Sequence, residues 1–162
     1  MTAVTVCAPL GGRVLAMADV PDPVFSEQML GPGLAIDPPL AEQLDVFSPV
    51  DGTVRTVLPH AVAVQTDAGH GVLVHLGLNT VEMQGTGFLL AVSKGDVVEV
   101  GQHVISWSPR DVDSTGRSVV TAVVALQAEP EELRLLVVPG DEVAAGDPLY
   151  VWTRPTPAGR VQ

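Results

Sequence analysis

The sequence predicts an all-β fold in a single domain, and three observations favour it. The 162 residues include 16 Gly and 14 Pro, scattered so closely that a long helix has no room. Short Val-rich runs lie between them, and β-branched runs separated by turn signals are typical of sandwiches and barrels. One turn-and-strand pattern also occurs twice. We therefore expect an antiparallel β-sandwich or barrel-like hybrid with internal repeated half-motifs and only short helical turns.

The elements follow in chain order from these signals. Brief helical turns are expected at 26–30 ("SEQML") and 108–114 ("SPRDVDS"). The Val-rich runs predict strands at 61–66, 71–76, 96–100, 118–126 and 133–138. The domain is expected to span residues 1–152. The last ten residues, 153–162 ("TRPTPAGRVQ"), are expected to form a flexible C-terminal tail.

Two pieces of the chain repeat. "KGDVVEVGQHVISW" aligns with "PGDEVAAGDPLYVW" 45 positions later (140 − 95 = 45), and "APLGGRV" aligns with "SPVDGTV" 40 positions later (49 − 9 = 40). In the first pair a Gly-Asp turn leads into a strand, and a second Gly lets the chain reverse. Two related half-motifs packed together would bury both apolar faces, so Trp107 and Trp152 are expected to anchor a shared core.

The composition excludes several classes of function. A net charge of −11 repels phosphate backbones and anionic lipids, so nucleic-acid and direct membrane binding are disfavoured and a basic protein partner is the natural complement. The apolar runs are too short to span a bilayer, and nothing before Pro9 has the form of a signal peptide, so we expect a cytoplasmic protein. The lone Cys7 excludes an internal disulfide.

The repeated Gly-Asp pattern also occurs in biotinyl and lipoyl carrier domains, which is an alternative function. Those domains attach their prosthetic group to a lysine at a hairpin tip. The single lysine of this chain, Lys94, precedes the repeated turn instead, so the pattern gives this carrier function little support.

Two histidines are placed by one predicted hairpin. Residues 60–66 ("HAVAVQT") alternate like a half-buried strand, "DAGHG" turns, and "VLVHLG" returns, which brings His60 and His75 towards the open end of the hairpin. Their separation in sequence does not fix the register, so it is equally compatible with one surface-exposed histidine and one hydrogen-bonded core histidine. His70 and His103 are expected to be solvated turn residues.

A close pair of imidazoles suits phosphoryl transfer. A neutral ring nitrogen is a competent nucleophile near neutral pH, and it can take a phosphoryl group and pass it on. A second ring can donate a hydrogen bond to the phosphoryl oxygens. Gly77, two residues after His75, would let backbone N–H groups approach those oxygens without interference from a Cβ atom.

The stretch "GHGVLVHLGLNTVE" resembles the phosphorylation-site signature of the glucose-type enzyme IIA family of the bacterial phosphoenolpyruvate-dependent sugar phosphotransferase system. The matching features are the apolar triplet before His75, the H-L-G-L run, and Thr80-Val81-Glu82. The resemblance continues, in the family's order, in these further segments: "VPDPVFSEQMLGPGLAI", "FSPVDGTV", "PHAVAV", "GTGF" and "KGDVVEVGQ". It covers the chain from about Val4 to Trp152.

The resemblance implies a compact antiparallel β-sandwich with the two histidines in a shallow apolar depression. It implies that His75 accepts the phosphoryl group from the phosphocarrier protein HPr, and that His60 supports its transfer to a cysteine of enzyme IIB during sugar uptake. Family members also regulate other proteins by binding them according to phosphorylation state. No metal or cofactor is implied, and the sequence identifies neither the sugar nor any regulatory target.

Several departures from the family pattern concern the surface where partners dock, which we expect to include Pro32, Leu76, Leu78 and Asn79. Gly31-Pro32-Gly33 stands where many members have Gly-Asp-Gly, and Asn79 stands where many have Asp. Leu58 replaces a Thr two residues before His60, which removes a side-chain hydrogen bond from the site.

The lysostaphin-type zinc hydrolases, which share a related β architecture, are a further alternative. Zinc hydrolysis needs three protein ligands and an open position. Four residues after His75 stands Asn79, a poor zinc ligand, and the chain contains no H-x-H motif. The sequence therefore disfavours a zinc hydrolase.

Overall fold

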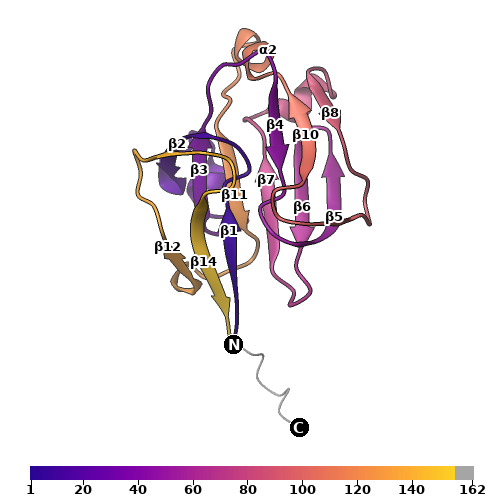
Figure 1. The fold of residues 1–162 in the computed structure, drawn as a ribbon. Coiled ribbons are helices and arrows are strands. Elements are labelled where there is room, and N and C mark those ends of the chain that lie inside the picture. The colour runs from indigo at the N-terminus through magenta and orange to yellow at the C-terminus, as the bar shows by residue number, and fades with distance from the viewer. Residues whose placement is uncertain (156–162) are drawn as a thin grey trace.

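A computed structural model describes residues 1–155 of the protein. One eight-stranded sheet faces two three-stranded sheets, and all strand pairs are antiparallel (Figure 1). The strands are β1 (Thr2–Cys7), β2 (Gly12–Ala16), β3 (Gly33–Asp37), β4 (Leu44–Phe47), β5 (Gly52–Leu58), β6 (Ala61–Gln65), β7 (Gly71–His75), β8 (Phe88–Leu90), β9 (Val97–Val98), β10 (His103–Trp107), β11 (Thr121–Ala125), β12 (Leu133–Leu135), β13 (Glu142–Val143) and β14 (Pro148–Arg154). The predicted all-β class with short helical turns is confirmed.

The helices are one or two turns long. They are α1 (Pro23–Ser26), α2 (Pro109–Ser114) and the 3₁₀ turns η1 (Met17–Asp19), η2 (Thr80–Met83) and η3 (Pro130–Glu132). The Asp22 side chain caps α1 by accepting the Val24 N–H, and the Ser108 side chain caps α2 by accepting the Asp111 N–H. Proline at the first position starts both helices, as proline there has no N–H to leave unpaired.

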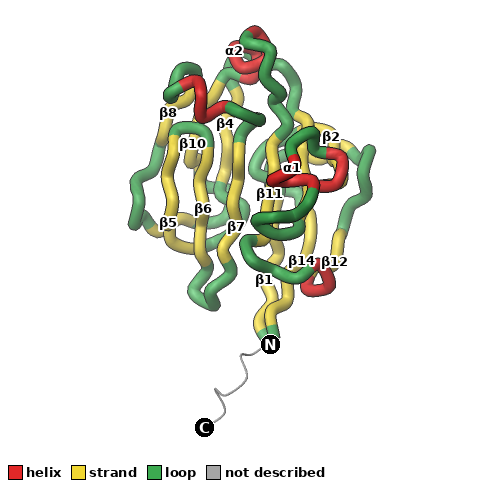
Figure 2. Tube along the Cα trace, turned by 180° about the vertical axis from the view of Figure 1, so that it is seen from behind, coloured by secondary structure: helices red, strands yellow, loops and turns green. Residues whose placement is uncertain are grey.

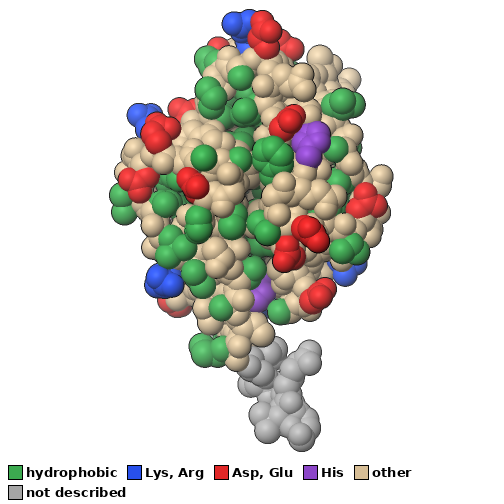
Figure 3. Space-filling view, in the orientation of Figure 1, with side chains coloured by type: hydrophobic (Ala, Val, Ile, Leu, Met, Phe, Trp, Pro, Cys, Tyr) green, Lys and Arg blue, Asp and Glu red, His purple; other side chains and the backbone are tan. Residues whose placement is uncertain are grey.

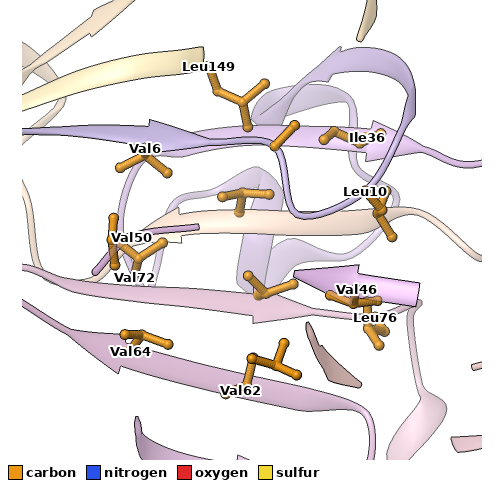
Figure 4. Packing of buried hydrophobic residues seen from close by; sticks show 14 of the residues in the cluster. Val6, Leu10, Ile36, Val46, Val50, Val62, Val64, Val72, Leu76 and Leu149 are labelled. Atoms are coloured by element: carbon orange, nitrogen blue, oxygen red, sulfur yellow. The ribbon is translucent and has the colours of Figure 1, made fainter. Parts of the chain in front are cut away.

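The large sheet has the strand order β13-β2-β3-β11-β7-β6-β5-β9, and the small sheets have the orders β1-β14-β12 and β4-β10-β8. Val62 and Val64 of β6 and Val72 and Val74 of β7 point from the large sheet into the main core, where each is fully buried. Figure 4 shows Val62, Val64 and Val72 in the same core as Val6, Val46 and Leu149 from the facing strands. Alternation along these strands therefore leaves every second residue of β7, including His75, on the outer face.

The predicted repeat is a pair of equivalent half-motifs in the structure. The Cys7 N–H donates to the Pro49 carbonyl over 3.0 Å, and the Phe47 N–H donates to the Pro9 carbonyl over 2.9 Å. At the offset of 40 residues Cys7 corresponds to Phe47 and Pro9 to Pro49, so each half-motif makes the same hydrogen bond to the other. Strands β9–β10 and β13–β14 occupy equivalent places, and Trp107 and Trp152 are 2% and 0% exposed. Both tryptophans are core residues, as predicted.

A second, smaller core lies on the outer face of the large sheet. Met17 and Val20 around η1 and Phe25 of α1 cover Ala35, Ala122 and Val124 there. Figure 2, seen from behind, shows α1 lying over this face near β11. This small core forms the wall against which the ring of His75 packs.

The surface carries the negative charge expected from the sequence. Carboxylates are spread over the face shown in Figure 3, and basic side chains lie only near its margins. No helix among residues 1–155 is long and apolar enough to cross a membrane.

Most predicted elements occur close to their predicted positions. The hairpin at 61–76 is β6 and β7, and the helical turn predicted at 108–114 is α2. The helical turn predicted at 26–30 was placed too late, because α1 ends at Ser26. The runs at 96–100 and 133–138 form strands of only two and three residues. Strand β14 continues to Arg154, two residues past the predicted domain boundary, and residues 156–162 of the predicted tail lie outside the described residues.

Candidate functional site

His75 is the last residue of β7 and lies half-buried on the outer face of the large sheet. In the strand register it lies between Ala61 of β6 and Ala122 of β11, whose small side chains leave room for the imidazole. The ring of Phe25 from α1 lies against it, with ring centroids 5.1 Å apart. The site is thus formed where the small outer core ends.

The tautomer of His75 is set by Gly77. The Nδ1 atom of His75 lies 2.8 Å from the Gly77 carbonyl oxygen. Because a carbonyl can only accept, Nδ1 carries the proton and donates it to this bond. The neutral ring therefore keeps its lone pair on Nε2, which makes Nε2 the nucleophilic atom.

His60 faces His75 from the tight turn between β5 and β6. The register pairs Leu58 with Ala61, so Pro59 and His60 form the turn itself, and the His60 carbonyl accepts the Leu76 N–H over 2.8 Å. The two imidazole rings lie 5.0 Å apart between centroids and nearly perpendicular, at 76°. The expectation that the hairpin brings the two histidines together is met by this geometry.

Burial at the site favours the neutral forms of both histidines. Burial lowers the pKa of His60 below its ordinary value, and the charge that a protonated His75 would carry lowers the pKa of His60 further. Burial likewise lowers the pKa of His75, while the hydrogen bond to Gly77 and the carboxylate of Asp22 act in the opposite direction. A neutral imidazole is the form that can attack phosphorus, so the surroundings favour the reactive state.

The loop after His75 is fixed by three contacts. Gly77 has φ +74°, and a Cβ atom there would lie 2.6 Å from Thr80 Cγ2 and 2.8 Å from the Ser118 carbonyl oxygen. The Thr80 hydroxyl donates to the Leu76 carbonyl over 2.7 Å. Arg117 donates from Nε to the Asn79 carbonyl and pairs with Glu82. These contacts hold the Gly77 carbonyl in the position that orients His75.

The structure corrects part of the predicted docking surface. Pro32 is buried, and Leu76 and Leu78 are only 0% and 4% exposed, because Leu76 points into the main core and Leu78 into the outer core. Their side chains cannot contact a partner, and only Asn79 of the four is exposed.

Apolar side chains exposed on segments next to the histidines are Leu58, Val81 and Leu89, at 45%, 63% and 72%. Leu58 belongs to the strand that enters the His60 turn, and Val81 belongs to η2. Leu89 follows Phe88, whose ring lies 6.4 Å from that of His60, but strand alternation turns Leu89 away from the core side that Phe88 faces. Leu58 and Val81 therefore present the apolar surface beside the histidines.

The other two histidines also differ from their prediction as solvated turn residues. His70 does lie in the hairpin turn but is 1% exposed, because its ring packs edge-on against Trp152 at 4.8 Å and its Nδ1 lies 3.2 Å from the Thr66 hydroxyl. His103 is half-buried at the start of β10, where its Nε2 lies 2.8 Å from the Ser106 hydroxyl. Neither ring belongs to the site.

Sequence reasoning missed Phe25 and Arg117 as site residues. Phe25 lies 50 positions before His75 in a short helix, outside the predicted hairpin, and Arg117 lies in a polar loop. Only the folding of distant segments onto the β7 end reveals them. Among residues 1–155, no group of three or more His, Cys, Asp or Glu side chains is arranged to hold a metal ion.

Comparison with known proteins connects this geometry to one family. Residues 4–131 match the family described as "phosphoenolpyruvate-dependent sugar phosphotransferase system, EIIA 1". The chain is 35% identical over 147 residues to a PTS system glucose-specific EIIA component of Oceanobacillus iheyensis, covering 89% of this chain and 86% of that protein. It is 37% identical over 123 residues to the Staphylococcus aureus protein of the same name, covering 75% and 72%.

A solved structure agrees in fold. The chain superposes on glucose permease IIA from Mycoplasma capricolum with a TM-score of 0.82 and 31% sequence identity, covering 93% of this chain and 96% of that one. The agreement extends over nearly the whole length of both chains.

Proposed function

The chain belongs to the EIIA 1 family of the phosphoenolpyruvate-dependent sugar phosphotransferase system, and from this premise we propose that Nε2 of His75 is the atom that carries the phosphoryl group. As an EIIA component, the chain is a phosphocarrier of this system. The observation that carries the proposal is the 2.8 Å bond from His75 Nδ1 to the Gly77 carbonyl, which leaves Nε2 unprotonated beside His60.

The transfer onto His75 forms one bond to phosphorus and breaks another. The lone pair of Nε2 attacks phosphorus, the bond from phosphorus to the donor group breaks, and that bond's electron pair leaves with the donor. The Nδ1 proton stays on His75, where the Gly77 carbonyl stabilises the positive charge that the phosphorylated ring gains. A phosphoryl group on such a cationic ring leaves readily, which suits a carrier.

His60 is proposed to support the phosphoryl group and its departure. Its ring lies edge-on to that of His75, 5.0 Å away between centroids, and an N–H of a neutral imidazole can donate to a phosphoryl oxygen. The tight turn at Pro59 and the bond from the Leu76 N–H to the His60 carbonyl limit movement of the ring. His60 is thus placed to act on the phosphoryl group without being the atom that carries it.

The proposed partners are HPr as phosphoryl donor and a cysteine of enzyme IIB as acceptor, with the chain working in the cytoplasm. A net charge of −11 suits a basic donor, and the exposed Leu58 and Val81 supply an apolar contact. Because the relatives carry glucose in their names, glucose is the first sugar to test. Phosphorylation would add a dianion to this apolar surface, which supports a further proposal, regulatory binding that depends on phosphorylation state.

The test is reconstitution with phosphoenolpyruvate, enzyme I and HPr, followed by intact mass spectrometry. The protein should gain one phosphoryl group, and a His75→Gln variant should gain none. His103→Gln is the matched control, since His103 lies outside the site, and it should be labelled like the unaltered protein. Full labelling of the His75 variant would refute the assignment.

A further inference from the structure

A cleft of about 550 Å³ lies on the same outer face of the large sheet as His75. Its floor includes Ala63 and Gln65 of β6 and Gly71 of β7. The register pairs Gln65 with Gly71, four residues along β7 from His75. At about 3.3 Å per residue, this row is about 13 Å from the histidine row. The cleft is therefore distinct from the phosphoryl site but shares its surface.

Two arginines line this cleft, and each is held in place by the chain. A β-bulge at Arg55 interrupts the pairing of β5 with β6, and such bulges redirect a side chain. The Arg55 Nε atom donates to the Gln65 side-chain oxygen over 2.9 Å. Arg154 donates from Nη1 to the Gly69 carbonyl over 2.6 Å, and its guanidinium lies over the Trp152 ring at 5.8 Å. Both guanidinium groups are thus oriented before any ligand arrives.

Neither arginine has a carboxylate partner within 4.0 Å among residues 1–155, although the chain has 19 acidic residues against eight basic ones. Arg110 and Arg117, by comparison, both pair with a glutamate. Two oriented guanidinium groups with unused N–H donors in a strongly acidic protein are suited to an anion, because a guanidinium matches carboxylate and phosphate geometry.

The rest of the cleft is apolar or neutral. Met29 and Leu30 are 68% and 37% exposed at its rim, and Leu126 also contributes to its wall. The volume falls within the range of about 300 to 1,000 Å³ that small-molecule sites occupy. An apolar wall beside two cations selects a molecule that has an apolar body and an anionic head.

We propose that this cleft binds a small organic anion, whose phosphate or carboxylate head is held by Arg55 and Arg154 and whose apolar body lies on Met29, Leu30 and Leu126. The binding does not require phosphorylation of His75. A ligand here would lie on the same face of the sheet as His75.

The probes are phenyl phosphate, inorganic phosphate and the neutral benzyl alcohol, each titrated into the full chain by calorimetry. Phenyl phosphate should bind, inorganic phosphate should bind about tenfold more weakly, and benzyl alcohol should not bind measurably. Arg55→Gln and Arg154→Gln should each lower the affinity for phenyl phosphate about tenfold, because a hydrogen bond to a charged group is lost. Arg110→Gln, which changes an exposed arginine outside the cleft, should leave binding unchanged.

Amide NMR shifts of the unaltered protein test the location independently of any variant. Phenyl phosphate should shift the amides of Gly69, Gly71 and Gln127 and leave that of His103 unchanged. Shifts confined to the neighbourhood of His75 would overturn the proposal, as would binding that both cleft variants retain. If inorganic phosphate bound as tightly as phenyl phosphate, the proposed contact of an apolar body with Met29, Leu30 and Leu126 would be wrong.

Discussion

Replacing Gly77 with alanine should uncouple His75 from the carbonyl that orients it. Gly77 has φ +74°, a conformation that costs an L-residue roughly 1–2 kcal/mol. The new Cβ would also lie 2.6 Å from Thr80 Cγ2 and 2.8 Å from the Ser118 carbonyl oxygen, and overpacking of this kind costs about 1–3 kcal/mol. The free energy of unfolding should therefore fall by about 2–5 kcal/mol.

Gly116→Ala is the matched control. Gly116 has φ +82°, but a Cβ atom there would meet nothing within 4 Å, so only the conformational cost of roughly 1–2 kcal/mol applies. For a chain of this size, each kcal/mol lowers the melting temperature by about 2–4 °C. Both variants carry the backbone strain of an alanine at positive φ, but only Gly77→Ala should displace the loop that follows His75.

The assay is the rate of phosphoryl transfer from phospho-HPr, measured well below both melting temperatures. Gly77→Ala should slow this transfer by about one to two orders of magnitude, since a displaced carbonyl no longer fixes the Nδ1–H tautomer, whereas Gly116→Ala should leave the rate unchanged. If Gly77→Ala matched the control in both stability and rate, the orienting role of this carbonyl would be wrong.

Three further predictions concern the histidines and their loop. His60→Gln keeps a donor but cannot carry a positive charge, so it should still accept a phosphoryl group from HPr yet pass it to enzyme IIB about two to three orders of magnitude more slowly; a normal relay rate would contradict this. The pKa values of His60 and His75 are lowered by burial, so the unfolded chain binds protons first, and the melting temperature should fall as pH drops below about 6.5. Replacing both histidines with Gln should make that dependence shallower without abolishing it, because burial also lowers the pKa of His70; an unchanged slope would count against the prediction. Asn79→Asp should speed transfer from a basic HPr at low salt and lose this effect at high salt, because Asn79 is exposed and exposed charges are screened. If the variant matched the unaltered protein at both salt concentrations, Asn79 would lie outside the docking surface.

The local part of the fold could be predicted from the sequence. Alternating valines set the hairpin that carries His60 and His75, and the Gly-Asp repeats predicted two equivalent halves sharing a core. The hairpin depends on residues close together along the chain, and the two halves follow from a repeat that the sequence itself contains. The resemblance of the segment around His75 to a known signature suggested the chemistry, and the comparisons confirmed the family.

What the sequence could not predict depends on contacts between distant segments. His70 looked solvated because glycines flank it, yet Trp152 from β14 covers its ring. Pro32 and Leu78 looked available to partners, yet both are buried, Leu78 in the outer core to which Met17 and Phe25 also belong. The orienting role of the Gly77 carbonyl also needed the structure, since the sequence suggested only that Gly77 lets backbone N–H groups approach a phosphoryl group.

The central claim is that Nε2 of His75 carries the phosphoryl group while Nδ1 keeps its proton. It is tested most directly by NMR of protein labelled with ¹⁵N in its histidine rings, phosphorylated in place with phosphoenolpyruvate, enzyme I and HPr. We predict coupling between phosphorus and Nε2 of His75, with Nδ1 still bearing a proton bonded to the Gly77 carbonyl. Coupling of phosphorus to Nδ1 of His75, or to either nitrogen of His60, would contradict the account.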